Sequence, residues 1–161
     1  MSKTFAWFPA LMLAAAFATS AAAMDTPKPD PKEPDKKGSQ LEQARAAIDA
    51  KNWTGAQAIL REAVARNPQN ADLQNLYAYS MRMGPDPAMD LVFRHYNEAL
   101  RLEPKLRGAH EYIGEAYLMS GNVPKAREHL ALLEKLCGAD CREYKLLKVA
   151  VAAQEQQHAQ K

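Results

Sequence analysis

The only two cysteines of the chain, Cys137 and Cys141, stand four positions apart in the segment LEKLCGADCREYKLLK. Gly138 breaks the helical pattern between them and lets the side chains turn toward each other, so that a disulfide is favoured in an oxidising compartment. Two thiols would also suit Cu(I), although His129 stands two helical turns before Cys137. A redox-active pair is a third alternative, but CxxxC is not the CxxC spacing of disulfide exchangers. The sequence favours a structural disulfide and leaves metal binding and redox chemistry open.

The other residues that could do chemistry form no catalytic or metal-binding pattern. Histidines occur without HxxxH or HExxH spacing, at His95, His110, His129 and His158. The sequence has no glycine-rich phosphate loop and no GxSxG motif. Most carboxylates stand beside Lys or Arg, where solvated ion pairs on helix faces explain them. We therefore expect a protein that is not an enzyme and that holds no metal or cofactor.

Composition narrows the class of partner. The chain has 161 residues, of which 47% are hydrophobic and 25% are charged, as is typical of one modest globular domain. Its 21 basic and 19 acidic residues leave a formal charge of +2, which lacks the one-sided field that nucleic-acid binding needs. We therefore expect no nucleic-acid partner.

Residues 1–23 are typical of a secretory signal peptide. Lys3 precedes the apolar stretch FAWFPALMLAAAFA, and small residues ending at Ala23 offer a cleavage site. The alternative is a retained membrane anchor, but the apolar run falls short of about 20 residues and contains Pro9. We therefore expect export to the periplasm, cleavage near Ala23 and no stable membrane insertion afterwards.

Residues 24–39 indicate a linker. Four prolines alternate with Lys, Asp and Glu, and no large apolar residue follows Met24 before Leu41. Such a segment has little to bury and favours an extended, polyproline-type conformation. The alternative is a proline-rich ligand for an aromatic groove of a partner, which Pro31 and Pro34 would supply as a loose PxxP motif.

From residue 40 onward the hydrophobic periodicity is helical. Ala, Leu, Glu, Gln, Lys and Arg dominate, and no alternating run is long enough for a strand. Turn-forming segments divide the region at 51–53, 67–70, 84–87, 103–104, 120–122 and 137–140. The pattern predicts seven helices, arranged as three pairs and a single one.

The breaks recur with a nearly constant period. Pro104 follows Pro68 by 36 residues, and Gly138 follows Pro104 by 34, which is the length of a helix-turn-helix repeat. The repeats are expected at about 37–70, 71–106 and 107–140, within a domain at 40–140. Residues 141–161 are expected to form a capping helix with a polar tail.

The third repeat has the clearest pattern. In RGAHEYIGEAYL, Ile113 and Gly114 are followed by Tyr117, and a turn at Gly121 leads to Ala126. This pattern resembles the tetratricopeptide-repeat family, and with LEKLCGADCREYKLLK it is similar to small exported bacterial repeat proteins that end in a two-cysteine corner. The resemblance implies an all-α fold of three helix-turn-helix repeats in a short right-handed solenoid plus a C-terminal capping helix. It implies no reaction, because such proteins are assembly and interaction scaffolds.

The repeat pattern also predicts the core. Small residues that let paired helices approach closely are expected at Ala44, Ala56, Ala78, Gly114 and Ala126. Larger residues are expected to fill the space between one pair and the next at Leu60, Tyr96 and Leu130. The last helix carries an apolar face that would cover the end of the solenoid, with Tyr144, Leu147 and Val151.

In the resembled family the first helix of each pair lines a concave groove. Carrying those positions over predicts a partner-binding set of Arg45, Asp49, Asn75, Tyr79, Arg82, Glu111, Tyr112, Glu115 and Met119. Tyrosines offer flat anchors, and the charged residues could fix the direction of a bound peptide. We expect a non-catalytic periplasmic scaffold or adaptor that binds a peptide or protein partner in this groove. The alternative is a copper-handling or thiol-redox accessory protein that acts through Cys137 and Cys141.

Overall fold

The computed structural model describes residues 39–159, all of which lie in one compact unit, Pro34–Lys161. The predicted signal peptide, its cleavage position and almost all of the predicted linker fall outside the described residues, as does the end of the polar tail. Within residues 39–159 the secondary structure consists of seven α-helices with no strand, so the all-α prediction is confirmed. No helix in this part of the chain has the length and apolar character needed to cross a membrane.

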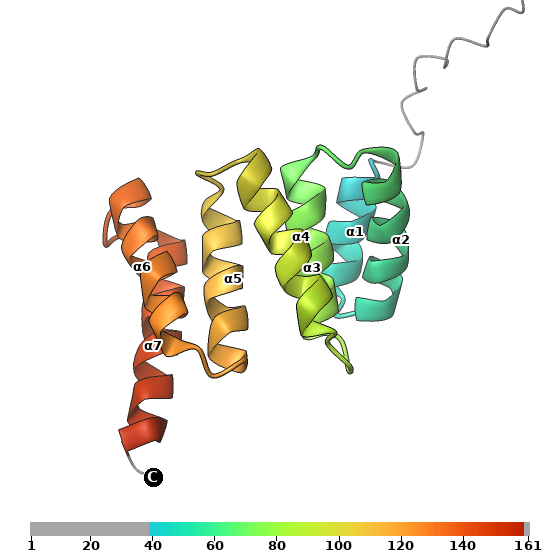
Figure 1. Ribbon diagram of the computed structural model, residues 1–161. Helices are drawn as coiled ribbons and strands as arrows, with labels where there is room; N and C mark the ends of the chain where they lie inside the picture. Colours follow the sequence, from blue (N-terminus) through green and yellow to red (C-terminus); the bar gives the residue numbers. More distant parts are fainter. Residues whose placement is uncertain (1–38, 160–161) are drawn as a thin grey trace, which may run out of the picture. The chain divides into compact units, whose positions relative to one another are not determined.

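The helices follow one another as hairpins, as Figure 1 shows. Their contacts run mainly between neighbours in the sequence, and the last helix packs on both helices of the third hairpin. The helix boundaries fall at the predicted breaks. The elements are α1 (Gln40–Asp49), α2 (Trp53–Arg66), α3 (Ala71–Met83), α4 (Met89–Leu102), α5 (Arg107–Met119), α6 (Val123–Cys137) and α7 (Arg142–Ala159).

Polar side chains fix the starts of four helices. Ser39 and Glu42 form a capping box at α1, in which Ser39 Oγ accepts a hydrogen bond from the Glu42 amide and the Glu42 carboxylate accepts one from the Ser39 amide. An asparagine side chain accepts a bond from the backbone three residues later at the starts of three further helices, at Asn52, Asn70 and Asn122. These bonds satisfy amides that the helices leave open, and they explain why each helix begins where it does.

The core consists of three apolar clusters, each shared by three consecutive helices. The first joins α1, α2 and α3, the second joins α3, α4 and α5, and the third joins α5, α6 and α7. All the predicted small residues are buried, as are Leu60 and Tyr96. Leu130 also packs against the third cluster but is only partly buried, and Leu133 is fully buried one turn later.

Gly114 permits a close helix contact, as predicted, but the helix that approaches it is not the paired helix. A Cβ added at this position would lie 2.5 Å from Leu147 Cδ2. The missing side chain therefore makes room for the capping helix α7 and not for the paired helix α6. The face of α7 that docks here carries Tyr144, Leu147 and Val151, the residues predicted for it, and all three are buried.

Candidate partner-binding site

Arg82, in the last turn of α3, connects three helices. Its side chain is only 5% exposed. The guanidinium donates from Nη2 to Glu115 Oε2 of α5 at 2.6 Å and from Nε to Tyr96 Oη of α4 at 3.3 Å. Nη1 lies 3.6 Å from the sulfur of Met119. The sequence predicted Arg82, Glu115 and Met119 for one surface, and the structure brings them into direct contact.

The electrostatics of this cluster keep the guanidinium charged and the phenol neutral. Burial opposes the charge on Arg82, but the Coulombic attraction and hydrogen bonds of Tyr96 and Glu115 leave its pKa raised. Burial raises the pKa of Tyr96, with Arg82 acting in the opposite direction. Arg82 is therefore fully engaged inside the protein and has a structural role at the base of this surface.

Aromatic rings adjoin the guanidinium. The rings of Tyr79 and Tyr112 lie 4.5 Å apart between centroids, and Trp53 meets Tyr79 edge-on at 6.0 Å. Arg82 Cζ lies 5.4 Å from the Tyr79 centroid and 6.0 Å from the Tyr112 centroid, within cation–π range. Trp53 was not predicted as a site residue, because the sequence only placed it beside a turn. The feature of the sequence that could have indicated Trp53 as a site residue is a large aromatic side chain at a hairpin corner.

Asn75 and Glu111 place unpartnered acceptor atoms within this region. Asn75 is 5% exposed and Glu111 is 3% exposed. Asn75 Oδ1 and Glu111 Oε2 are buried and accept no hydrogen bond from the described residues. Most buried polar atoms in proteins have a partner. We call these two atoms the acceptor pair.

Helix geometry places the acceptor pair on one surface. Asn75, Tyr79 and Arg82 follow at spacings of four and three along α3, so they share a face. Gly108, Glu111 and Glu115 follow at spacings of three and four along α5, so they also share a face. A Cβ added at Gly108 would meet Asn75 Nδ2 at 3.7 Å, so α3 and α5 adjoin here. We call the surface formed by Trp53, Asn75, Tyr79, Arg82, Glu111, Tyr112, Glu115 and Met119 the α3–α5 face.

Glu111 is the titratable group of the α3–α5 face whose charge is easiest to change near neutral pH. Burial raises its pKa to about 7, and the charges of Glu115 and Glu143 act in the same direction. Arg142 and Arg82 act against them. Glu143 and Arg142 belong to α7, so the capping helix contributes to the electrostatics of this surface. That contribution could not be predicted from the sequence, since it depends on how α7 docks.

The remaining predicted residues, Arg45 and Asp49, are exposed on α1. Among residues 39–159, no hydrogen bond or ion pair joins them to the α3–α5 face. The structure therefore assembles seven of the nine predicted residues into one region, and it adds Trp53 and the hydroxyl of Tyr96 to that region.

The two-cysteine corner joins the end of α6 to the start of α7. The sulfurs of Cys137 and Cys141 lie 2.03 Å apart, at disulfide distance, and their Cα atoms are 5.8 Å apart. Gly138 between them has φ 77°, in the left-handed region that favours glycine. A carboxylate oxygen of Glu143 lies within 4.8 Å of both sulfurs. The corner thus has the geometry of a clamp, and it places one further potential metal ligand beside the sulfurs.

A histidine pair lies between α5 and α6. His110 Nδ1 and His129 Nδ1 are 3.0 Å apart, and His110 Nε2 is 2.9 Å from the carbonyl oxygen of Pro104. A carbonyl only accepts, so His110 carries its proton on Nε2 and accepts at Nδ1 from His129. Burial, and then the charge of His110, lowers the pKa of His129 to about 4. The pair is a satisfied polar contact between α5 and α6.

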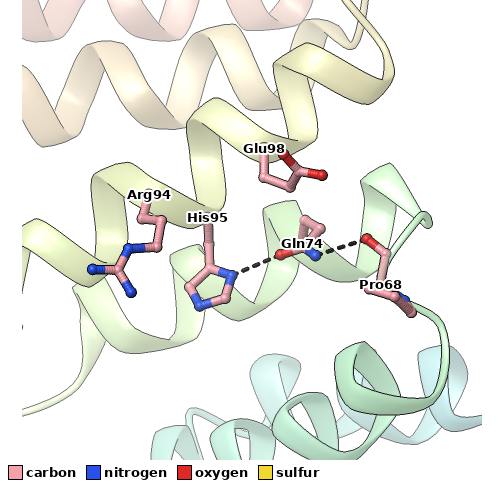
Figure 2. Close-up of a pocket in the computed structure, with 5 residues that line it drawn as sticks. All are labelled: Pro68, Gln74, Arg94, His95 and Glu98. Atoms are coloured by element: carbon pink, nitrogen blue, oxygen red, sulfur yellow. Dashed lines mark hydrogen bonds between the residues drawn. The ribbon is translucent and has the colours of Figure 1, made fainter.

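A pocket of about 290 Å³ lies elsewhere, between the corner that joins α2 to α3 and helix α4 (Figure 2). Gln74 Nε2 donates to the Pro68 carbonyl at 2.8 Å, and His95 Nδ1 donates to Gln74 Oε1 at 2.6 Å. Burial, and then Arg94, lowers the pKa of His95. Gln74 thus bonds to both Pro68 and His95, and none of the predicted partner-binding residues lines the pocket.

Comparisons with known proteins agree with this architecture. Residues 41–88 match a family model described as tetratricopeptide repeat. No curated protein sequence matches the chain. Among solved structures, the chain is similar to the Yersinia enterocolitica type III secretion translocator chaperone SycD, with a TM-score of 0.63 and 13% identity over 74% of this chain and 83% of that one.

A second similar structure is SycD of the same organism in complex with a peptide of the translocator YopD. It has a TM-score of 0.60 and 15% identity over 73% of this chain and 88% of that one. At such identities the similarity establishes the fold alone. Residues 41–88 therefore match the tetratricopeptide-repeat model, and the helices that follow them continue the same helix-turn-helix architecture, which is also the fold of SycD.

Proposed function

We propose that this protein is a non-catalytic scaffold or adaptor that binds a segment of a partner protein on the α3–α5 face. The observation that carries the proposal is the acceptor pair, Asn75 Oδ1 and Glu111 Oε2, which is buried without a partner among the described residues and lies on the same surface as the Tyr79 and Tyr112 rings. A fold like that of a chaperone crystallised with a peptide of its partner supports a protein-binding role.

The side chains of the α3–α5 face divide into a fixed base and a contact layer. Arg82 bonds to Glu115 and Tyr96, which holds the base in place. Met119 is 55% exposed, so it can contact a partner directly. Tyrosine rings contribute large contact areas with little loss of conformational entropy, and they are enriched among residues that dominate binding energy.

Photocrosslinking tests where the partner binds. A photoreactive amino acid replaces Met119 on the α3–α5 face or, as a control, Leu132, which is exposed on α6. We expect a discrete crosslinked partner from Met119 and none from Leu132 when cells that express the protein are irradiated. The Tyr79→Ala, Tyr112→Ala double variant should abolish the Met119 product while its helical circular dichroism is retained. A product that survives the double variant would contradict the proposed face.

We further propose that the protein works in the periplasm after removal of residues 1–23. A reporter fused after Ala23 should be exported, and the purified protein should begin at or near Met24. Recovery of uncleaved protein from the cytoplasm would overturn the proposed location and remove the oxidising environment that favours a disulfide.

A second candidate function is metal handling or redox chemistry at the two-cysteine corner. The observation in its favour is the Glu143 carboxylate, which lies within 4.8 Å of both sulfurs. Titration of free thiols in protein isolated without reductant distinguishes the candidates. We expect no free thiol and no bound metal, whereas two free thiols with one copper ion per chain would favour the second candidate.

A further inference from the structure

We infer that the α3–α5 face binds a basic partner segment, and that a lysine or arginine side chain of this segment donates hydrogen bonds to Asn75 Oδ1 and Glu111 Oε2. The inference rests on the proposed function and names the chemistry of its ligand. The first argument is the contrast with the other buried polar side chains of residues 39–159. All of them make hydrogen bonds within the protein, namely Gln74, Ser80, Arg82 and His110.

The second argument is the chemical identity of the two unpartnered atoms. Both are oxygens, one of an amide and one of a carboxylate. An acceptor is satisfied only by a donor, so an acidic side chain or a carbonyl group of a ligand would leave both atoms unpaired. An ammonium or guanidinium group brings several donors together with the charge that a carboxylate favours.

The third argument is charge balance. The charges that act on Glu111 come from Glu115 and Arg82, which pair with each other, and from Glu143 and Arg142 of α7. When Glu111 is ionised, its carboxylate and those of Glu115 and Glu143 carry three negative charges. The two arginines carry two positive charges, so one negative charge has no counterpart. One cationic side chain of a ligand completes the balance.

The fourth argument is the local shape and the adjoining rings. Gly108 has no side chain one turn before Glu111, and an added Cβ would have only Asn75 Nδ2 as a neighbour within 4 Å. Cα–Cβ bonds on a helix tilt toward its N-terminus, so the side chain of Glu111 starts out toward the Gly108 turn. Burial raises the pKa of the Tyr112 phenol, and the charge of Glu111 is the second cause. Glu111 and Tyr112 are therefore close to each other. Tyr112 and Tyr79 already receive one cation, Arg82, and their rings suit a second.

The test uses protein purified from expressing cells and pools of labelled 12-residue peptides. The pools share randomised flanks and differ only in a central residue, which is lysine, arginine, norleucine or glutamate. We expect the lysine and arginine pools to bind at least about tenfold more tightly than the norleucine pool, since a charge-assisted hydrogen bond contributes about 1.4 kcal/mol or more. The glutamate pool should bind most weakly.

Two variants assign the preference to the acceptor pair. Glu111→Gln keeps the size of the side chain and removes its charge, so the lysine preference should disappear. Gly108→Leu fills the space beside Asn75 and should weaken the lysine pool most. The matched control Glu134→Gln removes a carboxylate from an exposed position on α6 and should leave the preference unchanged.

The pH dependence of binding provides an independent readout. The affinity of the lysine pool should rise between pH 6 and pH 8, because Glu111 ionises at about pH 7, and it should be flat in Glu111→Gln. Equal affinity of the lysine and norleucine pools would overturn the inference, and so would a preference for glutamate. No binding by any pool at about 1 mM, where even weak complexes form, would also overturn it. If the Met119 crosslink persists in any of these cases, only the basic ligand is wrong and the binding face stands.

Discussion

His110 and Glu111 are neighbours on α5 and both are buried, but they differ in whether their polar atoms have hydrogen-bond partners. One ring nitrogen of His110 bonds to the Pro104 carbonyl in the turn before α5, and the other bonds to His129 of α6. Glu111 lies on the side of α5 that interacts with α3 and α7, and its Oε2 has no hydrogen-bond partner among the described residues. The same helix therefore carries a completed polar contact on one side and an open one on the other.

The difference separates a structural role from a binding role. A buried polar group that joins two elements of a fold is normally satisfied within the fold, because leaving it unpaired costs about 1 to 3 kcal/mol. The His110 contact has this character. The unpaired Glu111 oxygen destabilises the free protein in this way, and a hydrogen bond from a ligand would offset the loss. The following experiments ask whether these two sides of α5 behave independently.

Overpacking at Gly114 should have the largest effect on stability. Gly114→Leu adds bulk where an added Cβ alone would lie 2.5 Å from Leu147, so the free energy of unfolding should fall by about 3 kcal/mol, the upper end of the usual range. Ala126→Leu is the matched variant on α6. Chemical denaturation measures both.

In NMR titrations, Gly114→Leu should change the pKa of Glu111 and leave that of His129 unchanged, and Ala126→Leu should do the reverse. Wild-type stability in both variants would show that the assigned contacts of α5 are wrong.

Glu111 should make the folded state less stable as pH rises. Its pKa is about 7 in the folded protein against 4.5 for an unperturbed glutamate. Its favourable contribution is therefore fully present below pH 4.5 and is lost as pH rises through 7, by about 2 to 3 kcal/mol. The difference in unfolding free energy between wild type and Glu111→Gln, measured by urea denaturation across this range, isolates the effect. Parallel curves for the two proteins would mean that Glu111 is ordinarily solvated.

His129 should have the opposite pH dependence. Its pKa is lowered from 6.5 to about 4, so its contribution is present above pH 6.5 and is lost as pH falls toward 4. We expect a loss of about 2 kcal/mol, because the ring is partly exposed and solvent screens its charge. His129→Gln keeps a donor for His110 and does not titrate, so its stability should be flat over this range relative to wild type. A pH dependence unaltered by the substitution would remove His129 from the explanation.

The two-cysteine corner should have the smallest effect. Replacing both Cys137 and Cys141 with serine opens a very short loop, for which chain entropy gives a loss of no more than about 2 kcal/mol. The loss should appear as faster hydrogen exchange in α7. Partner crosslinking from Met119 should persist, because the corner and the α3–α5 face use different residues. If crosslinking disappears while α7 keeps its protection, the corner itself takes part in the function.

Much of the fold could be predicted from the sequence because it depends on local signals. The spacing of Pro68, Pro104 and Gly138 fixed the repeat length, and small residues such as Ala78 and Ala126 marked the close helix contacts. The degree of burial of Leu130 is an exception, because it depends on a tertiary contact. Leu130 and Leu133 are both apolar and one turn apart, so only the docking angle of α6 decides which one enters the core.

The site could be predicted only in outline, because its decisive contacts join distant residues. Arg82 and Glu115 are 33 positions apart, and nothing in either local sequence indicates that they pair. The influence of Glu143 on Glu111 depends on the position of α7. The unpartnered oxygen of Glu111 is a property of the assembled structure, since its side chain alone does not tell whether a donor will be near.

The central claim is that Glu111 binds a cationic side chain of a partner. The pKa of its carboxyl group tests this claim most directly. The measurement is a pH titration by NMR of protein labelled with ¹³C at the glutamate side chains, in the free state and with a saturating peptide of the lysine pool. We expect a pKa of about 7 in the free protein and a fall toward the ordinary glutamate range in the complex, because a nearby positive charge favours the ionised form. A pKa that stays at about 7 in a saturated complex would contradict the claim.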